Sequence, residues 1–240
     1  MTTSYHKSKS PTREIGGQSF VRIPVKTHCI MPGEDFVEIA YKYCKDIVQP
    51  GDVIILCQKA LAISQGRIRA IDEVEPRPLA EFLSHQLTDL RYSQGVGSSE
   101  FVEVAMQEVG PARVALAGAV QSVTRMLGRS GDFAEVAGKE VGLMRDFDAT
   151  LPAPHDRYVF LAPDQPQEVV DRLGRRIGVQ ACVASANDLG QVHVVAHTSG
   201  VDKKLVQQQL LDNPLGQGGN LTPIGIIRKV DSQAAMSARR

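Results

Sequence analysis

The stretch CVASANDLGQVHVVAHTSGVD, residues 182–202, predicts two strands joined by a tight turn. Two apolar runs with many β-branched residues, 179–185 and 191–198, flank the turn residues 186–190. Elsewhere the chain alternates between helical and strand patterns. Because a hairpin interrupts this alternation, the sequence favours an α+β fold with mixed sheets and helices over a doubly wound parallel sheet.

The periodicity of apolar residues predicts the other elements. Strands are expected over residues 20–26, 53–57, 158–161 and 222–230. One helix is expected to start within residues 32–35, to carry its apolar positions from 36 to 47 and to end before residue 50, and further helices are expected over 79–90, 100–109, 113–127, 166–177 and 203–211. Residues 132–143 fit either a strand or a helix.

Proline and aspartate cluster near residues 145–157, which indicates a boundary between two lobes. We therefore expect an N-terminal α/β lobe over 20–150 and a C-terminal α/β lobe over 151–230. The polar ends, 1–19 and 231–240, are expected to be disordered tails.

Composition excludes several classes of protein. The 240 residues carry no formal net charge and no tryptophan, which argues against a nucleic-acid partner. No apolar stretch is long enough for a membrane span, and the polar N-terminus lacks the apolar core of a secretory signal. The four cysteines form no CxxC pair and are expected to be free thiols. These features predict a cytoplasmic protein without a nucleic-acid or membrane partner.

Three positions are candidates for chemistry. Lys59 follows an apolar strand, where open sheets place ligands, and a lysine there suits a phosphate; the alternative is a solvated lysine. Asp188 either closes its turn or binds a cation. Asp148 lies in a proline-rich loop, where acids are commonly solvated; two such carboxylates suit Mg²⁺ only if their loops meet.

Two stretches carry a family resemblance. The first is IPVKTHCIMPGEDFVEIAYKYCKDIVQPGDVIILCQKALAISQGRI, residues 23–68, and the second is YVFLAPDQPQEVVDRLGRRIGVQACVASANDLG, residues 158–190. Both are similar to the coenzyme F-420 gamma-glutamyl ligases. The resemblance implies a two-lobed mixed α+β fold, a homodimer, and GTP with Mg²⁺ or Mn²⁺. It also implies joining of glutamate to a deazaflavin carboxylate that is first activated as an acyl phosphate.

The resemblance also implies roles for individual residues. Nucleotide binding is implied for Pro24, Val25, Lys26, Gln58 and Lys59. Metal binding is implied for Asp188 and for Asp148, with Asp146 as the fallback in the same loop.

Five positions depart from the family pattern: Ile63, Gln65, Leu151, Leu189 and Gln191. The family has a lysine, an acid, an asparagine, a threonine and an arginine at these positions in turn. The departures leave open an alternative, a catalytically altered, ligase-like protein that binds a nucleotide or a pterin- or deazaflavin-like ligand.

The C-terminal stretch DNPLGQ, residues 212–217, has no counterpart in the resemblance. Asp212, Asn213 and Gln217 are candidates for a separate substrate pocket.

Overall fold

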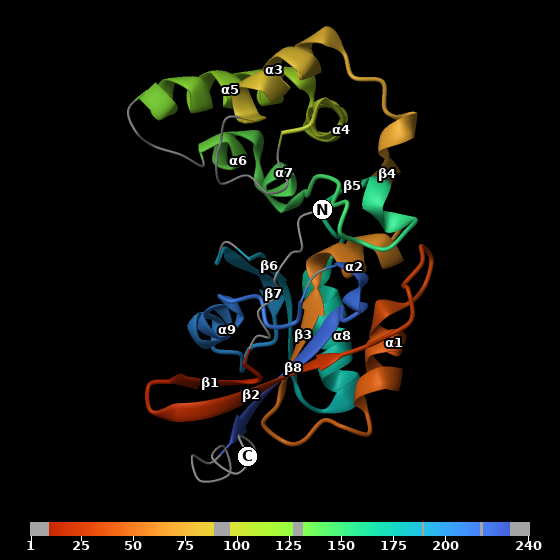
Figure 1. Ribbon diagram of the computed structural model, residues 1–240, viewed down its shortest axis with the longest axis vertical. Coiled ribbons are helices and arrows are strands. Elements are labelled where there is room, and N and C mark those ends of the chain that lie inside the picture. The colour runs from red at the N-terminus through yellow and green to blue at the C-terminus, as the bar shows by residue number, and fades with distance from the viewer. Residues whose placement is uncertain (1–9, 89–96, 127–131, 189, 217, 231–240) are drawn as a thin grey trace, which may run out of the picture. The chain divides into compact units, whose positions relative to one another are not determined.

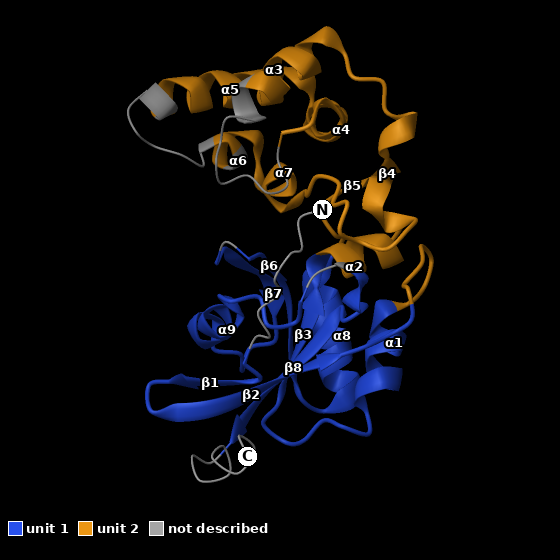
Figure 2. Ribbon diagram, viewed as in Figure 1, with its two compact units in different colours: residues 1–28, 36–58, 165–240 blue, residues 29–35, 59–164 orange. Residues whose placement is uncertain are grey.

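In the computed structural model, the described residues are 10–88, 97–126, 132–188, 190–216 and 218–230. They belong to two compact units (Figure 2). Unit 1 comprises residues 1–28, 36–58 and 165–240, and unit 2 comprises residues 29–35 and 59–164. The predicted boundary between residues 150 and 151 therefore falls inside unit 2, and unit 1 is discontinuous in sequence.

Unit 1 is built on a six-stranded mixed sheet with the order β1-β2-β8-β3-β6-β7 (Figure 1). Its strands are β1 (Thr12–Ile15), β2 (Gln18–Val25), β3 (Val53–Cys57), β6 (Gln180–Ala186), β7 (Val192–His197) and β8 (Ile224–Val230). Only β3 and β6 pair in parallel, and the other four pairings are antiparallel. The predicted hairpin of β6 and β7 and the α+β class are confirmed.

Helices cover both faces of this sheet (Figure 1). Their bounds are α1 (Phe36–Cys44), α8 (Pro166–Ile177) and α9 (Lys203–Leu210). Val206 and Leu210 of α9 pack on the face that carries Ile55. Because side chains alternate along a strand, Ile54 and Leu56 point to the opposite face, where α1 and α8 lie. This explains why β3 is apolar at every position.

The prediction of a disordered N-terminal tail is wrong for residues 12–19, because these residues form β1, the turn after it and the start of β2. Gly16 and Gly17 join the two strands, and both have positive φ angles, +56° and +74°. Two-residue hairpin turns of this kind favour glycine because it has no Cβ. The tails predicted over residues 1–9 and 231–240 lie outside the described part of the chain.

Unit 2 is mainly helical and includes a two-stranded antiparallel sheet. Its elements are α2 (Gln58–Ser64), β4 (Ile68–Ala70), α3 (Pro78–Thr88), α4 (Ser99–Val109), α5 (Pro111–Met126), α6 (Asp132–Ala137), α7 (Lys139–Leu143) and β5 (Tyr158–Phe160). The first residue of α2, Gln58, still belongs to unit 1. Short 3₁₀ turns cover Ile71–Glu73 and His155–Arg157 in unit 2, and Gly218–Asn220 in unit 1. The core is centred on Phe101, Met106 and Val114.

Segment 29–35 belongs to unit 2 although it lies between two parts of unit 1 in sequence. The His155 Nε2–H donates to the Ile30 carbonyl at 2.7 Å, and the Gly33 N–H donates to the Ser64 carbonyl at 2.8 Å. These bonds join distant parts of the chain, which explains why composition did not reveal the boundary.

Helix α2 was not predicted, because its seven residues are too short for a periodic signal. The ambiguous stretch 132–143 contains the two short helices α6 and α7. All four cysteines are free, as predicted. Within the described residues, no helix is long and apolar enough to cross a membrane.

Candidate functional site

Lys59 and Asp148 form an ion pair inside unit 2. Lys59 lies in the first turn of α2, which follows β3 with no intervening residue. Its Nζ donates to Oδ2 of Asp148 at 2.7 Å, and each side chain is 21% exposed. The Lys59 Nζ also lies 5.5 Å from the centre of the Phe160 ring. Two candidates 89 residues apart in sequence are therefore in direct contact, and both remain accessible to solvent.

Thr150 fixes the other oxygen of the Asp148 carboxylate. Its backbone N–H and its hydroxyl donate to Oδ1 at 3.0 and 2.6 Å. Burial by itself would raise the pKa of Asp148, but the charge of Lys59 and the hydrogen bonds from Lys59 and Thr150 outweigh it. The pKa is therefore held below its usual value, and Asp148 is ionised at neutral pH.

Asp146 has a different role from Asp148. Its side chain accepts hydrogen bonds from the Ser98 N–H and hydroxyl, at 2.9 and 2.7 Å, and from the Phe147 N–H. Ser98 is the N-cap of α4, so Asp146 holds the start of that helix in place. With 8% of the residue exposed, Asp146 is mainly structural, and Asp148 is the better candidate in this loop.

The other residues with an implied nucleotide role belong to unit 1. Pro24 and Val25 end β2 and pair with Gly225 and Ile224 of β8. Pro24 and Lys26 are exposed, whereas Val25 is buried. Gln58 is only 2% exposed, so its side chain offers little surface to a ligand.

Asp188 lies in the β6–β7 turn of unit 1 and is exposed. The side-chain bonds across this turn join Asn187 and Gln191: the Asn187 Nδ2 donates to Gln191 Oε1 at 2.8 Å, and the Gln191 N–H donates to Asn187 Oδ1 at 3.0 Å. Oδ1 of Asp188 instead accepts from Nδ2 of Asn213 at 3.2 Å. The turn therefore uses Asn187 and Gln191, and two of the candidates, Asp188 and Asn213, lie in contact.

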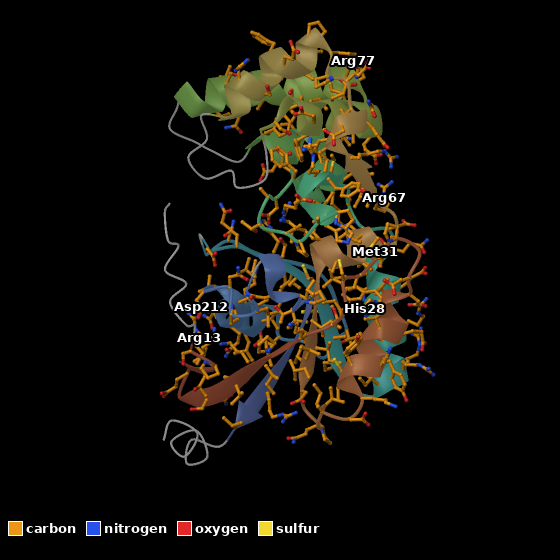
Figure 3. All side chains as sticks on the ribbon, turned by 45° about the vertical axis from the view of Figure 1, so that its right-hand side comes forward. Arg13, His28, Met31, Arg67, Arg77 and Asp212 are labelled. Atoms are coloured by element: carbon orange, nitrogen blue, oxygen red, sulfur yellow. The ribbon has the colours of Figure 1, made fainter. Side chains whose placement is uncertain are left out.

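Asp212 is bound by two arginines of the neighbouring strands. The Arg13 Nη1 donates to Oδ1 of Asp212 at 2.9 Å, and the buried Arg22 donates to the same oxygen. Figure 3 shows Arg13 and Asp212 side by side. Burial opposes the charge of Asp212, but the two arginines hold its pKa below the usual value. Asp212 therefore links α9 to β1 and β2, while Gln217 lies outside the described residues.

Three of the departures from the family pattern have structural roles here. Ile63 is buried within α2. The Gln65 amide donates to the Asp164 carbonyl and accepts from the Asp164 N–H, both at 2.8 Å. Gln191 closes the hairpin, whereas Leu189 lies outside the described residues.

The donor chemistry at Asp148 fits a hard divalent cation. Mg²⁺ is commonly bound by one or two carboxylates together with phosphate oxygens, and Mn²⁺ accepts the same ligands. Asp148 supplies an oriented, ionised carboxylate, and the Thr150 hydroxyl adds a second oxygen beside it. Among the described residues, no group of three or more His, Cys, Asp or Glu side chains is placed to hold a metal without further ligands.

Sequence reasoning missed Thr150 and Phe160 as neighbours of the candidate pair. Thr150 follows an aspartate by two residues, a spacing at which an aspartate side chain commonly accepts from the backbone, so a local signal existed. Phe160 is ten or more residues from either member of the pair, and only the fold brings it near Lys59.

Residues 24–186 match the family model described as F420-0:Gamma-glutamyl ligase. The matched range contains Lys59 and Asp148, and it ends before Asp188 and the stretch 212–217. A comparison with curated proteins finds no match. Since the match covers more than half of the chain, the protein belongs to the F420-0:gamma-glutamyl ligase family.

Proposed function

We propose that this member of the family is a GTP- and divalent-cation-dependent ligase that forms a gamma-glutamyl amide bond. Family membership supports the ligase class. The observation that carries the proposal is the contact of Lys59 with Asp148, in which a positive charge lies 2.7 Å from an ionised carboxylate. Phosphoryl transfer needs both, because the phosphate charge must be neutralised before a carboxylate can attack it.

The proposed reaction has two steps. A carboxylate oxygen of the acceptor attacks the γ-phosphorus of GTP, which forms an acyl phosphate and releases GDP. The glutamate nitrogen then attacks the acyl carbon, loses a proton and expels phosphate, leaving an amide. A bound Mg²⁺ or Mn²⁺ would neutralise phosphate oxygens during the transfer. Lys59 binds the phosphate oxygens, and Asp148 and Thr150 orient the cation.

The other candidates have supporting roles in this proposal. The exposed residues Pro24 and Lys26 contact the nucleotide, the buried residues Val25 and Gln58 position their chain neighbours for that contact, and Asp188 offers a carboxylate to a divalent cation. Asn213 then orients Asp188, since an amide that donates to a carboxylate fixes its direction. We also propose a homodimer in the cytoplasm, and light scattering tests the dimer as a mass twice that of the chain.

The test is turnover of the purified chain with GTP, Mn²⁺, glutamate and F420-0, followed by phosphate release and product mass. We expect Asp148→Asn to lower turnover about a hundredfold, because a bound cation supplies several kcal/mol of charge stabilisation. The matched control is Glu108→Gln, which removes the carboxylate of another unit 2 ion pair, Arg67–Glu108 at 2.9 Å. A wild-type chain that binds neither GTP nor Mn²⁺ would contradict the proposal.

A second candidate is a ligase-like binding protein without turnover. Two positions at which the family has charged residues favour this candidate. Ile63 is buried, and the Gln65 side chain binds the backbone of Asp164. Tight, cation-dependent GTP binding without phosphate release in the presence of F420-0 and glutamate would support this candidate over the ligase.

A further inference from the structure

We infer that Lys59 and Asp148 mask each other: in the absence of ligands, each side chain neutralises the charge that the other would offer to a ligand. The nucleotide phosphate and the divalent cation therefore bind cooperatively at this pair. The inference rests on the proposed function, because it assigns Lys59 to the phosphate and Asp148 to the cation. It adds a coupling between the two ligands, and the ion pair is its physical origin.

The geometry makes the ion pair and the cation mutually exclusive. Nζ of Lys59 lies 2.7 Å from Oδ2 of Asp148. A divalent cation of the Mg²⁺ type binds a carboxylate oxygen at about 2.1 Å, so it would occupy the direction that the ammonium now takes. The ammonium must therefore move away when a cation binds at Oδ2, since two positive charges repel at this distance.

The surroundings allow Lys59 to leave without disturbing Asp148. The two hydrogen bonds from Thr150 go to Oδ1, the oxygen that Lys59 does not use. The carboxylate therefore keeps its orientation when Lys59 departs. Lys59 is itself partly exposed, so rotation of its long side chain toward a phosphate needs no change in the backbone.

Charge balance then couples the two ligands. A cation alone leaves Lys59 without its carboxylate and beside a second positive charge. A phosphate alone takes Lys59 and leaves Asp148 facing another anion. When both ligands bind, Lys59 faces the phosphate and Asp148 faces the cation, so every charge is paired. By linkage, each ligand raises the affinity for the other by the same factor.

The first experiment measures Mn²⁺ binding to the full chain by calorimetry without nucleotide, which avoids formation of a Mn²⁺–GTP complex. We expect Lys59→Met to bind Mn²⁺ about tenfold more tightly than wild type, because the substitution removes the competing ammonium and keeps an apolar stem. The double variant Lys59→Met/Asp148→Asn must lose this gain, which assigns it to the Asp148 carboxylate.

The second experiment measures GTP binding in the presence of a chelator. We expect Asp148→Asn to bind GTP about tenfold more tightly than wild type, because Lys59 is released and a nearby negative charge is removed. The asparagine keeps an oxygen that accepts from Thr150, so the loop retains its hydrogen bonds. Glu108→Gln is the control in both experiments and should bind each ligand as wild type does, since its partner is Arg67.

The outcomes separate this inference from the proposed function. Unchanged Mn²⁺ affinity in Lys59→Met and unchanged GTP affinity in Asp148→Asn would overturn the masking, even if the wild type binds both ligands and turns over. A wild type that binds neither ligand would instead overturn the proposed function. A gain in Mn²⁺ affinity that persists in the double variant would also overturn the masking, because the cation would then bind elsewhere.

Discussion

Gln209 of α9 buries an amide that lacks hydrogen-bond partners within the described part of the chain. The residue is 0% exposed, and neither Nε2 nor Oε1 is bonded there. Its helix neighbours Val206 and Leu210 pack in the apolar cluster on the sheet. Burying an amide without partners costs about 1–3 kcal/mol, so this position reduces the stability of unit 1.

We predict that Gln209→Met raises the free energy of unfolding by about 1 kcal/mol, because methionine fills a similar volume without a polar group. Urea denaturation followed by circular dichroism measures the change. Gln208→Met, at an exposed position of the same helix, is the control and should have little effect. A loss of stability in Gln209→Met would mean that bound water satisfies the amide.

At the scale of the element, α4 shows how charges from other segments fix a helix. Glu103 is buried, and its carboxylate accepts from the Arg77 N–H and Nε and from the Gln107 amide, at 3.0–3.1 Å. Burial opposes ionisation of Glu103, but these bonds outweigh it and hold its pKa below the usual value of 4.5. The helix is thereby joined to the segment before α3.

This pKa shift predicts acid sensitivity. A carboxyl group whose pKa is lower in the folded state stabilises that state above pH 4.5, its value when unfolded. The stabilisation is lost as the pH falls through the lower folded value. Because the Arg77 side chain is half exposed, we expect a contribution of only about 1 kcal/mol. Denaturation experiments between about pH 6 and pH 3 should therefore show that the free energy of unfolding falls more steeply for wild type than for Glu103→Gln.

The control for this prediction is Glu81→Gln, which removes an equal charge from an exposed position of α3. It should follow the pH dependence of wild type closely. Parallel curves for wild type and Glu103→Gln would show that the pairing with Arg77 does not contribute to the stability of α4.

At the scale of the whole molecule, the last strand holds the first unit together. Strand β8 lies between β2 and β3, which are consecutive strands of unit 1 in sequence but do not pair with each other. Ile226 pairs with Ile23 on one side and Ile54 on the other, and it is fully buried. The sheet therefore depends on residues from both ends of the chain.

We predict that Ile226→Ala lowers the free energy of unfolding by about 2–5 kcal/mol, because it leaves a cavity in the centre of the sheet. Hydrogen exchange should show a loss of amide protection in β2 and in β3 together. Lys229→Ala, at an exposed position of the same strand, should change stability by less than about 0.5 kcal/mol. Loss of protection confined to β8 would contradict this interdependence of the strands.

The sequence by itself determined most of the local structure. It predicted β3 and α8 with the observed bounds, and it predicted the β6–β7 hairpin that marks the α+β class. Apolar periodicity and the helix-ending Gly178 are local signals, so neighbouring residues are enough to express them. The family resemblance was likewise carried by continuous stretches and is confirmed over residues 24–186.

Only the tertiary structure decided which distant residues meet. It placed β8 between β2 and β3, assigned segment 29–35 to the second unit, and brought Lys59 into contact with Asp148. It also distinguished Asp146, which holds the start of α4, from Asp148, which pairs with Lys59. The physical reason is that burial and charge pairing act between side chains close in space, and sequence separation does not encode that closeness.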